Sequence, residues 1–342
     1  MKEQIHQVTL NFADGVSRSF DVAAKSTILD AALAADVPLL YQCQSGSCSS
    51  CIAQLSEGDA VTRAGASSTL LASEYTAGQR LLCVCQARSD CTFELGYSSE
   101  VGSSVAKEVH AFVDSVDRIA SNVMRLSLEL ADGEWLDFRP GQFVQVEVPG
   151  FGVVRSYSPS STLSNMPKLE LLVRLLPGGA MSSYLEERAQ VEDVLTLSGP
   201  YGAFFLREEK RRAPHIFIAG GTGLAPILSM IDALHQGSGR KPPMLLNFGC
   251  ATPDALFCLD EIELRQQWLP SLEARICVDR EPEPGMHQGS PVSALCEGDV
   301  NSADTVAYLC GPQPMINAAT TRLIELGVDP ANIFSELFVA SH

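Results

Sequence analysis

Four cysteines in the first hundred residues constrain this chain more than any other feature. Cys43, Cys48 and Cys51 have the spacing C-x4-C-x2-C, and Cys83 follows after 31 intervening residues. This spacing is typical of plant-type [2Fe–2S] centres, in which four thiolates hold two irons and two bridging sulfides. The residues between the first three cysteines are mostly Ser and Gly, which let backbone N–H groups approach the cluster sulfurs. The pattern therefore predicts a [2Fe–2S] cluster, with Cys83 as the candidate for the fourth ligand.

A zinc site and a set of incidental thiols are the alternatives to this interpretation. Zinc usually takes two C-x2-C pairs or a mixture of Cys and His, and this loop supplies neither. The identity of the fourth ligand is open at this point, because Cys85 lies two residues beyond Cys83. Alternate residues of a strand face the same side, so both side chains could face the cluster. Cys91 is interpreted as a packed thiol.

Composition excludes several classes of function. The chain has 342 residues, 11 cysteines, 6 histidines and a net charge of −17. This acidity disfavours a nucleic-acid partner, and the odd number of cysteines disfavours a secreted disulfide framework. The sequence shows neither a secretory signal nor a membrane span, so we expect a cytoplasmic protein without a membrane partner. The histidines are scattered singly, which leaves no ligand set for a Rieske centre or a mononuclear oxygenase iron.

Changes of composition along the chain predict three domains. Residues 96–106 are small and polar and are interpreted as a linker, and residues 207–214 form a second, charged break. The first domain is expected to be α+β, with a helix that starts at Thr27. Short alternating strands predict an antiparallel β-barrel in the second, and strands that alternate with helices predict a doubly wound parallel α/β sheet in the third. The predicted domains are 1–98, 105–208 and 213–342.

Two motifs of the middle domain predict a flavin site. In the R-x-Y-S motif, Arg155 can pair with a pyrophosphate, Tyr157 can lie against the flavin ring, and Ser158 can hydrogen-bond the ring's polar edge. A barrel strand with a surface arginine is the alternative when this motif is taken alone. Farther along, a glycine turn and a helix start offer backbone N–H groups to phosphates. The candidate flavin-binding residues are Arg155, Ser156, Tyr157, Ser158, Val173, Arg174, Gly178, Gly179, Ala180, Met181 and Ser182.

Two turns at the ends of buried strands predict a pyridine-nucleotide site in the last domain. Ligands gather at the carboxyl edge of an open parallel sheet, and both turns are expected at that edge. The first turn is not G-x-G-x-x-G, so a purely structural turn is the alternative. Segment 249–254 has no cluster of Arg or Lys for a 2′-phosphate, which favours NADH over NADPH. The candidate residues are Gly220, Gly221, Thr222, Gly223, Cys310, Gly311 and Pro312, with Thr222 and Cys310 as catalytic candidates.

The order of these motifs resembles the reductase component of bacterial aromatic-ring-hydroxylating oxygenases, of the benzoate and anthranilate dioxygenase type. The resemblance covers essentially the whole chain, and residues 105–342 resemble the ferredoxin–NADP reductase superfamily. It implies a β-grasp ferredoxin domain with Cys83 as the fourth ligand, and FAD rather than FMN as the flavin. It also implies that Glu336 and Phe338, near the C-terminus, are catalytic candidates beside the flavin.

Electron counting gives the expected reaction. NADH delivers two electrons and an iron–sulfur cluster accepts one, so the flavin stands between them. The resemblance implies that the cluster then reduces a separate terminal oxygenase, expected to be Rieske-type, in the breakdown of aromatic compounds. The reductase itself is expected to be a monomer. Alternatives are a partner of another kind, such as a di-iron phenol, toluene or alkene monooxygenase or a deoxysugar dehydrase, and a redox sensor or adaptor.

Overall fold

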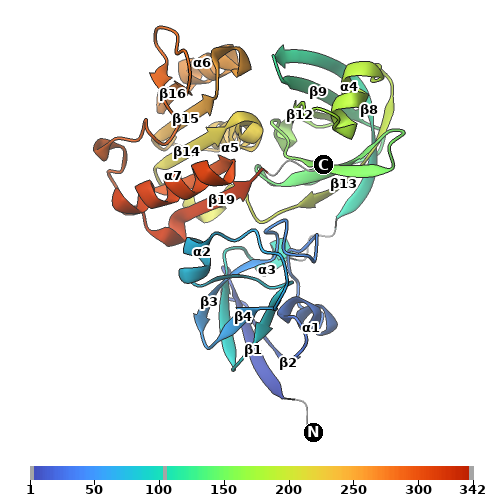
Figure 1. Ribbon diagram of the computed structural model, residues 1–342, viewed down its shortest axis with the longest axis vertical. Coiled ribbons are helices and arrows are strands. Elements are labelled where there is room, and N and C mark those ends of the chain that lie inside the picture. The colour runs from blue at the N-terminus through green and yellow to red at the C-terminus, as the bar shows by residue number, and fades with distance from the viewer. Residues whose placement is uncertain (1–3, 103–105, 339–342) are drawn as a thin grey trace. The chain divides into compact units, whose positions relative to one another are not determined.

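The computed structural model describes residues 4–102 and 106–338 (Figure 1). Packing divides the chain into two compact units, one of Met1–Ala106 with Tyr201–Ala203 and the other of Lys107–Pro200 with Phe204–His342. The finer division into 1–98, 105–208 and 213–342 stays a prediction. Among the described residues, no helix combines the length and apolar content that crossing a bilayer requires.

The first unit is an α+β fold on a mixed five-stranded sheet in the order β2-β1-β7-β3-β5. β1 pairs parallel with β7 and antiparallel with β2, and alternate residues of β1 are buried on one face, as in a half-buried strand. The strands of the unit are β1 (Ile5–Phe12), β2 (Ser17–Ala23), β3 (Ile52–Glu57), β4 (Ala60–Thr62), β5 (Gln79–Leu81), β6 (Cys85–Ala87) and β7 (Cys91–Leu95). Its helices are α1 (Ile28–Ala34), α2 (Ala72–Thr76) and α3 (Ser99–Gly102).

The helix predicted to start at Thr27 is confirmed as α1. The Thr27 hydroxyl accepts a hydrogen bond from the Asp30 backbone N–H at 3.1 Å, which satisfies one free donor of the first turn. The inner face of α1 buries Ile28 and Leu29 completely.

The prediction that 96–106 is a linker is wrong for the part that the structure describes. Tyr97 is buried, packs edge-on against Phe12 at 6.1 Å, and its hydroxyl accepts from the Leu40 backbone N–H. Helix α3 follows, and Ser99 donates to the Asp14 carboxylate through both its N–H and its hydroxyl. Small polar residues therefore do not leave this segment free, because one aromatic anchor and one carboxylate hold it against the sheet. Residues 103–105 lie outside the described part.

An antiparallel barrel forms the first part of the second unit. Its six strands have the order β11-β10-β13-β8-β9-β12, and a bridge between Pro159 and Leu171 joins the two edge strands. Alternate residues point into an apolar interior, as the sequence predicts. The strands are β8 (Lys107–Ala120), β9 (Val123–Leu130), β10 (Phe143–Val148), β11 (Val153–Tyr157), β12 (Lys168–Arg174) and β13 (Val194–Tyr201), with helix α4 (Ala180–Glu187).

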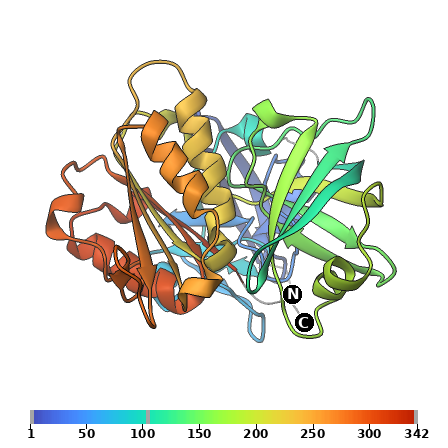
Figure 2. The same ribbon diagram turned by 90° about the horizontal axis from the view of Figure 1, so that it is seen from above.

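A parallel six-stranded sheet forms the rest of the unit, in the order β17-β16-β15-β14-β18-β19. Right-handed crossovers in both directions from β14 place α5 and α6 on one face and α7 on the other, as Figure 2 shows. The predicted doubly wound topology is thereby confirmed. The elements are β14 (His215–Gly220), α5 (Leu224–Gln236), β15 (Met244–Cys250), α6 (Leu259–Trp268), β16 (Leu272–Val278), β17 (His287–Gln288), β18 (Val306–Gly311), α7 (Gln313–Glu325) and β19 (Ile333–Leu337).

Candidate functional site

The four predicted metal ligands come from one loop and one turn of the first unit. Residues 43–51 form an irregular loop between α1 and β3, and Cys83 lies in the turn between β5 and β6. Gly46 in this loop has a φ of +82°, and a Cβ there would come within 2.2 Å of the Ser67 carbonyl oxygen. Only glycine allows both the conformation and the contact. The loop is fixed at that point by a hydrogen bond from Thr69 N to Gly46 O.

Backbone N–H groups of this region donate to the cysteine sulfurs. Cys43 Sγ accepts from Ser45 N at 3.4 Å and from Ser47 N at 3.3 Å. Cys48 Sγ accepts from Cys43 N, and Cys51 Sγ accepts from Cys83 N, each at 3.4 Å. Donors of this kind stabilise negative charge on sulfur and tune the potential of an iron–sulfur cluster.

The four thiols form one chain of contacts, in which Cys43 meets Cys48 and Cys83, and Cys83 also meets Cys51. A hydrogen bond from the Cys48 thiol lowers the pKa of Cys43, and the same bond raises the pKa of Cys48. Hydrogen bonding likewise lowers the pKa of Cys51 and raises that of Cys83. No three His, Cys, Asp or Glu side chains of the described residues surround one point where a single ion would sit. Four sulfurs in one connected set fit a group of two irons, whose positive charge would allow all four thiols to ionise.

Cys85 differs from Cys83 in its surroundings. Cys85 is the first residue of β6 and pairs with Thr62 of β4, whereas Cys83 lies in the turn before the strand. The two cysteines are therefore not alternate residues of one strand, and their side chains need not face the same side. Burial raises the pKa of Cys85 to about 12, which is typical of an inert packed thiol. The structure brings Cys83, and not Cys85, into hydrogen-bond contact with the sulfurs of the loop.

The R-x-Y-S motif lies on β11 and at its end. Arg155 and Tyr157 share one face of the strand, and Ser156 is exposed on the other. The Arg155 guanidinium donates to the Val154 carbonyl oxygen and forms no ion pair with a carboxylate among the residues that the structure describes. Its charge is therefore available for a phosphate.

The second predicted flavin segment follows β12. Arg174 is exposed at the end of the strand, while the Val173 side chain is buried in the barrel interior, so only the backbone of Val173 is available to a ligand. Gly179 is the N-cap of α4 and provides no side-chain cap, which leaves the first N–H groups of the helix for phosphate oxygens. The Ser182 hydroxyl accepts from the Leu176 backbone N–H at 2.8 Å, so it fixes the turn.

The two turns of the predicted nucleotide site meet at the carboxyl edge of the parallel sheet. β14 leads into Gly221–Gly223 and then α5, and β18 leads through Gly311 and Pro312 into α7. A Cβ on Gly223 would lie 2.2 Å from the Cys310 carbonyl oxygen, so the two turns touch through their backbones. Thr222 is buried in the first turn, and the N-terminus of α5 has no side-chain cap.

The C-terminal strand brings Glu336 to the same edge. β19 pairs parallel with β18, with Glu336 opposite Cys310. The Ser158 hydroxyl donates to Glu336 Oε2 at 3.4 Å, which joins the flavin motif to the nucleotide edge. Phe338 donates its N–H to the Gly311 carbonyl oxygen at 3.1 Å. Residues that the sequence placed in separate motifs thus form one constellation.

Burial sets the protonation of this constellation. It raises the pKa of Glu336 from 4.5 to about 8, and the hydrogen bond from Ser158 offsets part of the shift. It also raises the pKa of Cys310 well above its usual value, with a further contribution from Glu336. At neutral pH the edge therefore holds a protonated carboxyl next to a protonated thiol.

Replacing Glu336 with glutamine is expected to flatten the pH dependence of stability. Between pH 4.5 and about 8, the folded chain binds more protons at this site than the unfolded chain does. The contribution of Glu336 to the free energy of unfolding is therefore fully present below pH 4.5 and is lost as the pH rises through 8. Glu336→Gln should shift the urea midpoint between about pH 5 and about pH 8.5 less than wild type does. The exposed Glu325→Gln is the control, and an unchanged pH profile in Glu336→Gln would contradict the raised pKa.

Two residues near the nucleotide edge were not identified as candidates from the sequence. Cys250 ends β15 with a thiol whose pKa burial raises to about 12, while a backbone hydrogen bond from Gly221 and the charge of Arg174 lower it. Arg280 donates its N–H to Ala251 O at 3.0 Å and lies close enough to help lower the pKa of Asp254, after hydrogen bonds from Thr252 and Ser121. The position at the end of a buried strand could have indicated Cys250. Nothing in the local pattern indicates Arg280.

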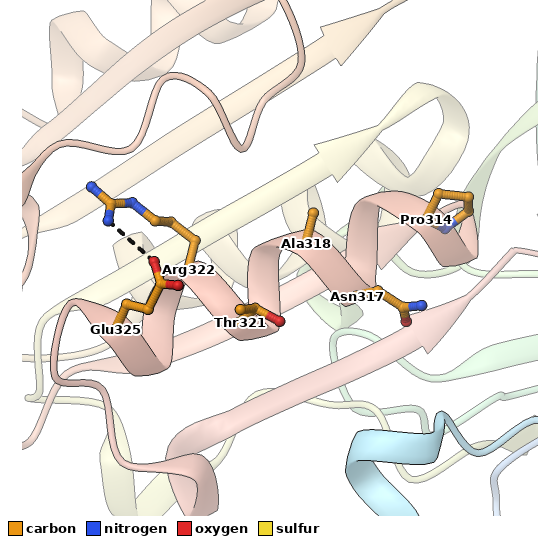
Figure 3. A pocket seen from close by; sticks show the side chains of 6 residues that line it. All are labelled: Pro314, Asn317, Ala318, Thr321, Arg322 and Glu325. Atoms are coloured by element: carbon orange, nitrogen blue, oxygen red, sulfur yellow. Dashed lines mark hydrogen bonds and ion pairs between the residues drawn. The ribbon is translucent and has the colours of Figure 1, made fainter.

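Helix α7 also carries a shallow hollow on its surface (Figure 3). Its lining comes from one helix, and its two charged members form an ion pair with each other at 3.3 Å, so no unpaired charge is offered to a ligand. The lining residues are Pro314, Asn317, Ala318, Thr321, Arg322 and Glu325.

Comparison with known domain families matches all three parts of the chain. The 2Fe-2S iron–sulfur cluster binding domain matches residues 11–88, the oxidoreductase FAD-binding domain residues 110–206, and the oxidoreductase NAD-binding domain residues 217–321. The fold and the site thus define an iron–sulfur flavoprotein oxidoreductase. Its cofactors are a [2Fe–2S] cluster, FAD and NADH.

Full-length relatives narrow this class. The chain is 34% identical to the toluate 1,2-dioxygenase electron transfer component of Pseudomonas putida, over 98% of this chain and 99% of the relative. It is 31% identical to the propane 2-monooxygenase reductase component of Mycolicibacterium smegmatis, over 97% of both chains. The structure of the Amycolatopsis cytochrome P450 reductase GcoB matches with a TM-score of 0.71 and 28% identity, covering 97% of this chain and 98% of GcoB. The chain belongs to the family of NADH-dependent electron transfer components of oxygenases.

Proposed function

We propose that this chain carries electrons from NADH to the Rieske-type terminal oxygenase of a system that hydroxylates aromatic rings. The match over nearly the full length of the toluate 1,2-dioxygenase component carries this proposal. The 2-halobenzoate and anthranilate 1,2-dioxygenase components, 31% and 29% identical, support it. The cluster, the flavin and the nucleotide are proposed to bind in the domains 1–98, 105–208 and 213–342, respectively.

The residues of the first unit are proposed to hold the cluster. Cys43, Cys48, Cys51 and Cys83 are its ligands, supported by the contacts that join their four sulfurs and by the backbone donors around them. The loop excludes side-chain bulk at Gly46 and supplies N–H groups that stabilise the thiolates.

The second unit is proposed to bind FAD and NADH. Arg155 and the start of α4 hold phosphates of FAD, and Tyr157 and Ser158 meet the flavin ring. The turn 220–223 holds the nucleotide pyrophosphate, and Cys310 and Glu336 keep a proton-rich, water-poor edge where the two cofactors meet. When bound, FAD supplies the conversion between a two-electron donor and a one-electron acceptor.

The setting of the reaction is part of the same proposal. We infer a cytoplasmic monomer that meets its oxygenase transiently, without nucleic acid or membrane. The net charge of −17 supports attraction to a more basic partner surface.

A monooxygenase is the second candidate for the electron acceptor. The propane 2-monooxygenase reductases at 31% identity and the xylene/toluene monooxygenase component of Pseudomonas putida at 32% identity support it. These relatives align with 97% and 95% of this chain, so the test below compares the two kinds of acceptor directly.

The test is to mix the purified protein with NADH and with candidate oxygenases, and to measure product formation. We expect turnover with an aromatic-ring dioxygenase and little with a propane or xylene monooxygenase, and the opposite ranking would favour the second candidate. NADPH should support a much lower rate than NADH. Equal rates with both nucleotides would contradict the proposed nucleotide specificity.

A further inference from the structure

A cluster of five charged side chains links the barrel to the parallel sheet within the second unit. Arg125 on β9 pairs with Glu170 on β12 at 3.3 Å and with Glu261 on α6. The first pair lies within the barrel, whereas the second joins the barrel to the sheet. Arg125, Glu170, Asp232, Glu261 and Arg265 are called the Arg125 cluster below.

The cluster continues from α6 into α5. Arg265 holds Asp232 with two parallel hydrogen bonds, from Nε to Oδ1 at 2.7 Å and from Nη2 to Oδ2 at 2.6 Å. It also approaches Glu261 Oε2 at 3.7 Å. The Arg265 and Asp232 side chains are only 11% and 18% exposed, so solvent screens this pair weakly. Bidentate pairs of this kind fix orientation as well as distance.

The residue that precedes α6 has an unusual backbone conformation. Cys258 is the N-cap of α6 with a φ of +55°, in the left-handed region that residues other than glycine rarely adopt. Its sulfur accepts from Arg125 Nη2 at 3.2 Å. A conformation of this kind persists where the surrounding contacts determine it, and such sites are often functional.

The two ends of the cluster lead to the two proposed cofactor sites. α5, which carries Asp232, begins at the turn 220–223 of the nucleotide site. β9, which carries Arg125, pairs antiparallel with β12, with Leu172 opposite Arg125, and β12 ends at Arg174 of the flavin site. One charged network therefore connects the helix behind the nucleotide turn with a strand that leads to the flavin.

We propose that Arg125 is a positioning residue for electron transfer from NADH to FAD. Through Glu261, and from there through Arg265 and Asp232, it holds the nucleotide turn at a fixed distance and angle from the flavin strand. This inference rests on the proposed function of the second unit. Transfer between two bound groups depends steeply on their mutual placement, and a misplacement of about 1 Å can cost roughly 100-fold in rate.

Charge balance agrees with this role. Burial alone would lower the pKa of Arg125, but Glu170 and Glu261 raise it above its usual value, so the guanidinium stays charged. The cluster contains two guanidinium groups and three carboxylates. Without Arg125, Glu170 and Glu261 would lose the cation that they share, and only Arg265 would remain beside Glu261.

The experiment compares two substitutions that each remove one carboxylate from Arg125. Glu261→Gln breaks the link to the sheet, whereas Glu170→Gln breaks only the contact within the barrel. Arg125→Gln removes both, and Arg125→Lys keeps the charge but loses the fork of donors. Arg118→Gln is the matched control, because Arg118 on β8 pairs with Glu186 on α4, away from the parallel sheet, and both side chains are more than 40% exposed. The readouts are FAD content, cluster absorption and the rate of flavin reduction by NADH in rapid mixing.

We expect Glu261→Gln and Arg125→Gln to slow flavin reduction by about 10-fold to 100-fold. Both should keep FAD and the cluster, Arg125→Lys should recover part of the rate, and Glu170→Gln and Arg118→Gln should stay within about twofold of wild type. Equal losses in Glu261→Gln and Glu170→Gln, or a wild-type rate in Glu261→Gln, would overturn the positioning role. Loss of FAD in Glu261→Gln would also overturn it, because the residue would then serve folding. A wild-type protein that NADH does not reduce would instead contradict the proposed function itself.

Discussion

Replacing Cys48 with serine is expected to remove the cluster absorption and nearly all NADH-dependent reduction of cytochrome c. The NADH-dependent reduction of ferricyanide should stay close to wild type. The reason is the division of the chain: Cys48 lies in the first compact unit, and the flavin and nucleotide motifs lie in the second. NADH should still reduce the flavin, but the flavin would lack the cluster as its one-electron acceptor. Absorption spectra and the two assays on the same preparation measure this.

Two further variants test which cysteine is the fourth ligand. Cys83→Ala should behave like Cys48→Ser, because Cys83 donates its N–H to Cys51 Sγ and its thiol contacts the loop sulfurs. Cys85→Ala should keep the cluster, because the Cys85 thiol is buried in β6, where burial and not a hydrogen bond to a loop sulfur determines its pKa. Loss of the cluster in Cys85→Ala with retention in Cys83→Ala would reverse the assignment. Loss of ferricyanide reduction in Cys48→Ser would contradict the independence of the two units.

The parts of the site that were predictable from sequence are those whose geometry is local. The C-x4-C-x2-C spacing forces three thiols into one loop, and a glycine turn between a buried strand and a helix sets where N–H groups collect. The fold classes followed from strand alternation and from the regular change between strands and helices. These signals come from residues that are close together in the chain, so they can be recognised in a single sequence.

The contacts that sequence did not reveal join distant positions. The hydrogen bond between Ser158 and Glu336 spans 178 residues, and the pair of Arg125 and Glu261 spans 136. Neither residue of the second pair lies in a recognisable motif, and an arginine on a strand is usually a solvated side chain. The role of such a residue becomes visible only when the topology brings its partner beside it.

The composition of one segment led to a wrong linker prediction for a physical reason. The segment 96–106 is rich in Ser and Gly, which usually indicates a flexible connection. Tyr97 and Ser99 together fix its first half, because the buried ring packs against Phe12 and Ser99 donates two hydrogen bonds to Asp14. A linker prediction is therefore weakest where one large apolar residue interrupts the polar run.

Replacing Gly223 with alanine is expected to lower kcat/KM for NADH by roughly 100-fold, because the nucleotide turn must move to make room. The new Cβ would lie 2.2 Å from the Cys310 carbonyl oxygen and 2.6 Å from its carbon, and both belong to backbone that cannot rotate away. Gly223 has a φ of −59°, so the effect comes from the collision and not from backbone strain. Overpacking of this kind also costs about 1–3 kcal/mol of stability. Steady-state kinetics with ferricyanide and thermal unfolding measure the two effects.

The control separates crowding at the two turns from a general cost of replacing glycine. Gly298→Ala introduces the same methyl group where no heavy atom lies within 4 Å, and it should be silent in both assays. In Gly223→Ala the cluster absorption should be unchanged, because the cysteines belong to the other unit. If Gly223→Ala kept the wild-type kcat/KM despite the displaced turn, the contact between 220–223 and Cys310 would not form the nucleotide site. The catalytic assignments of Thr222 and Cys310 would then have to be abandoned, while those of the cysteine ligands would stand.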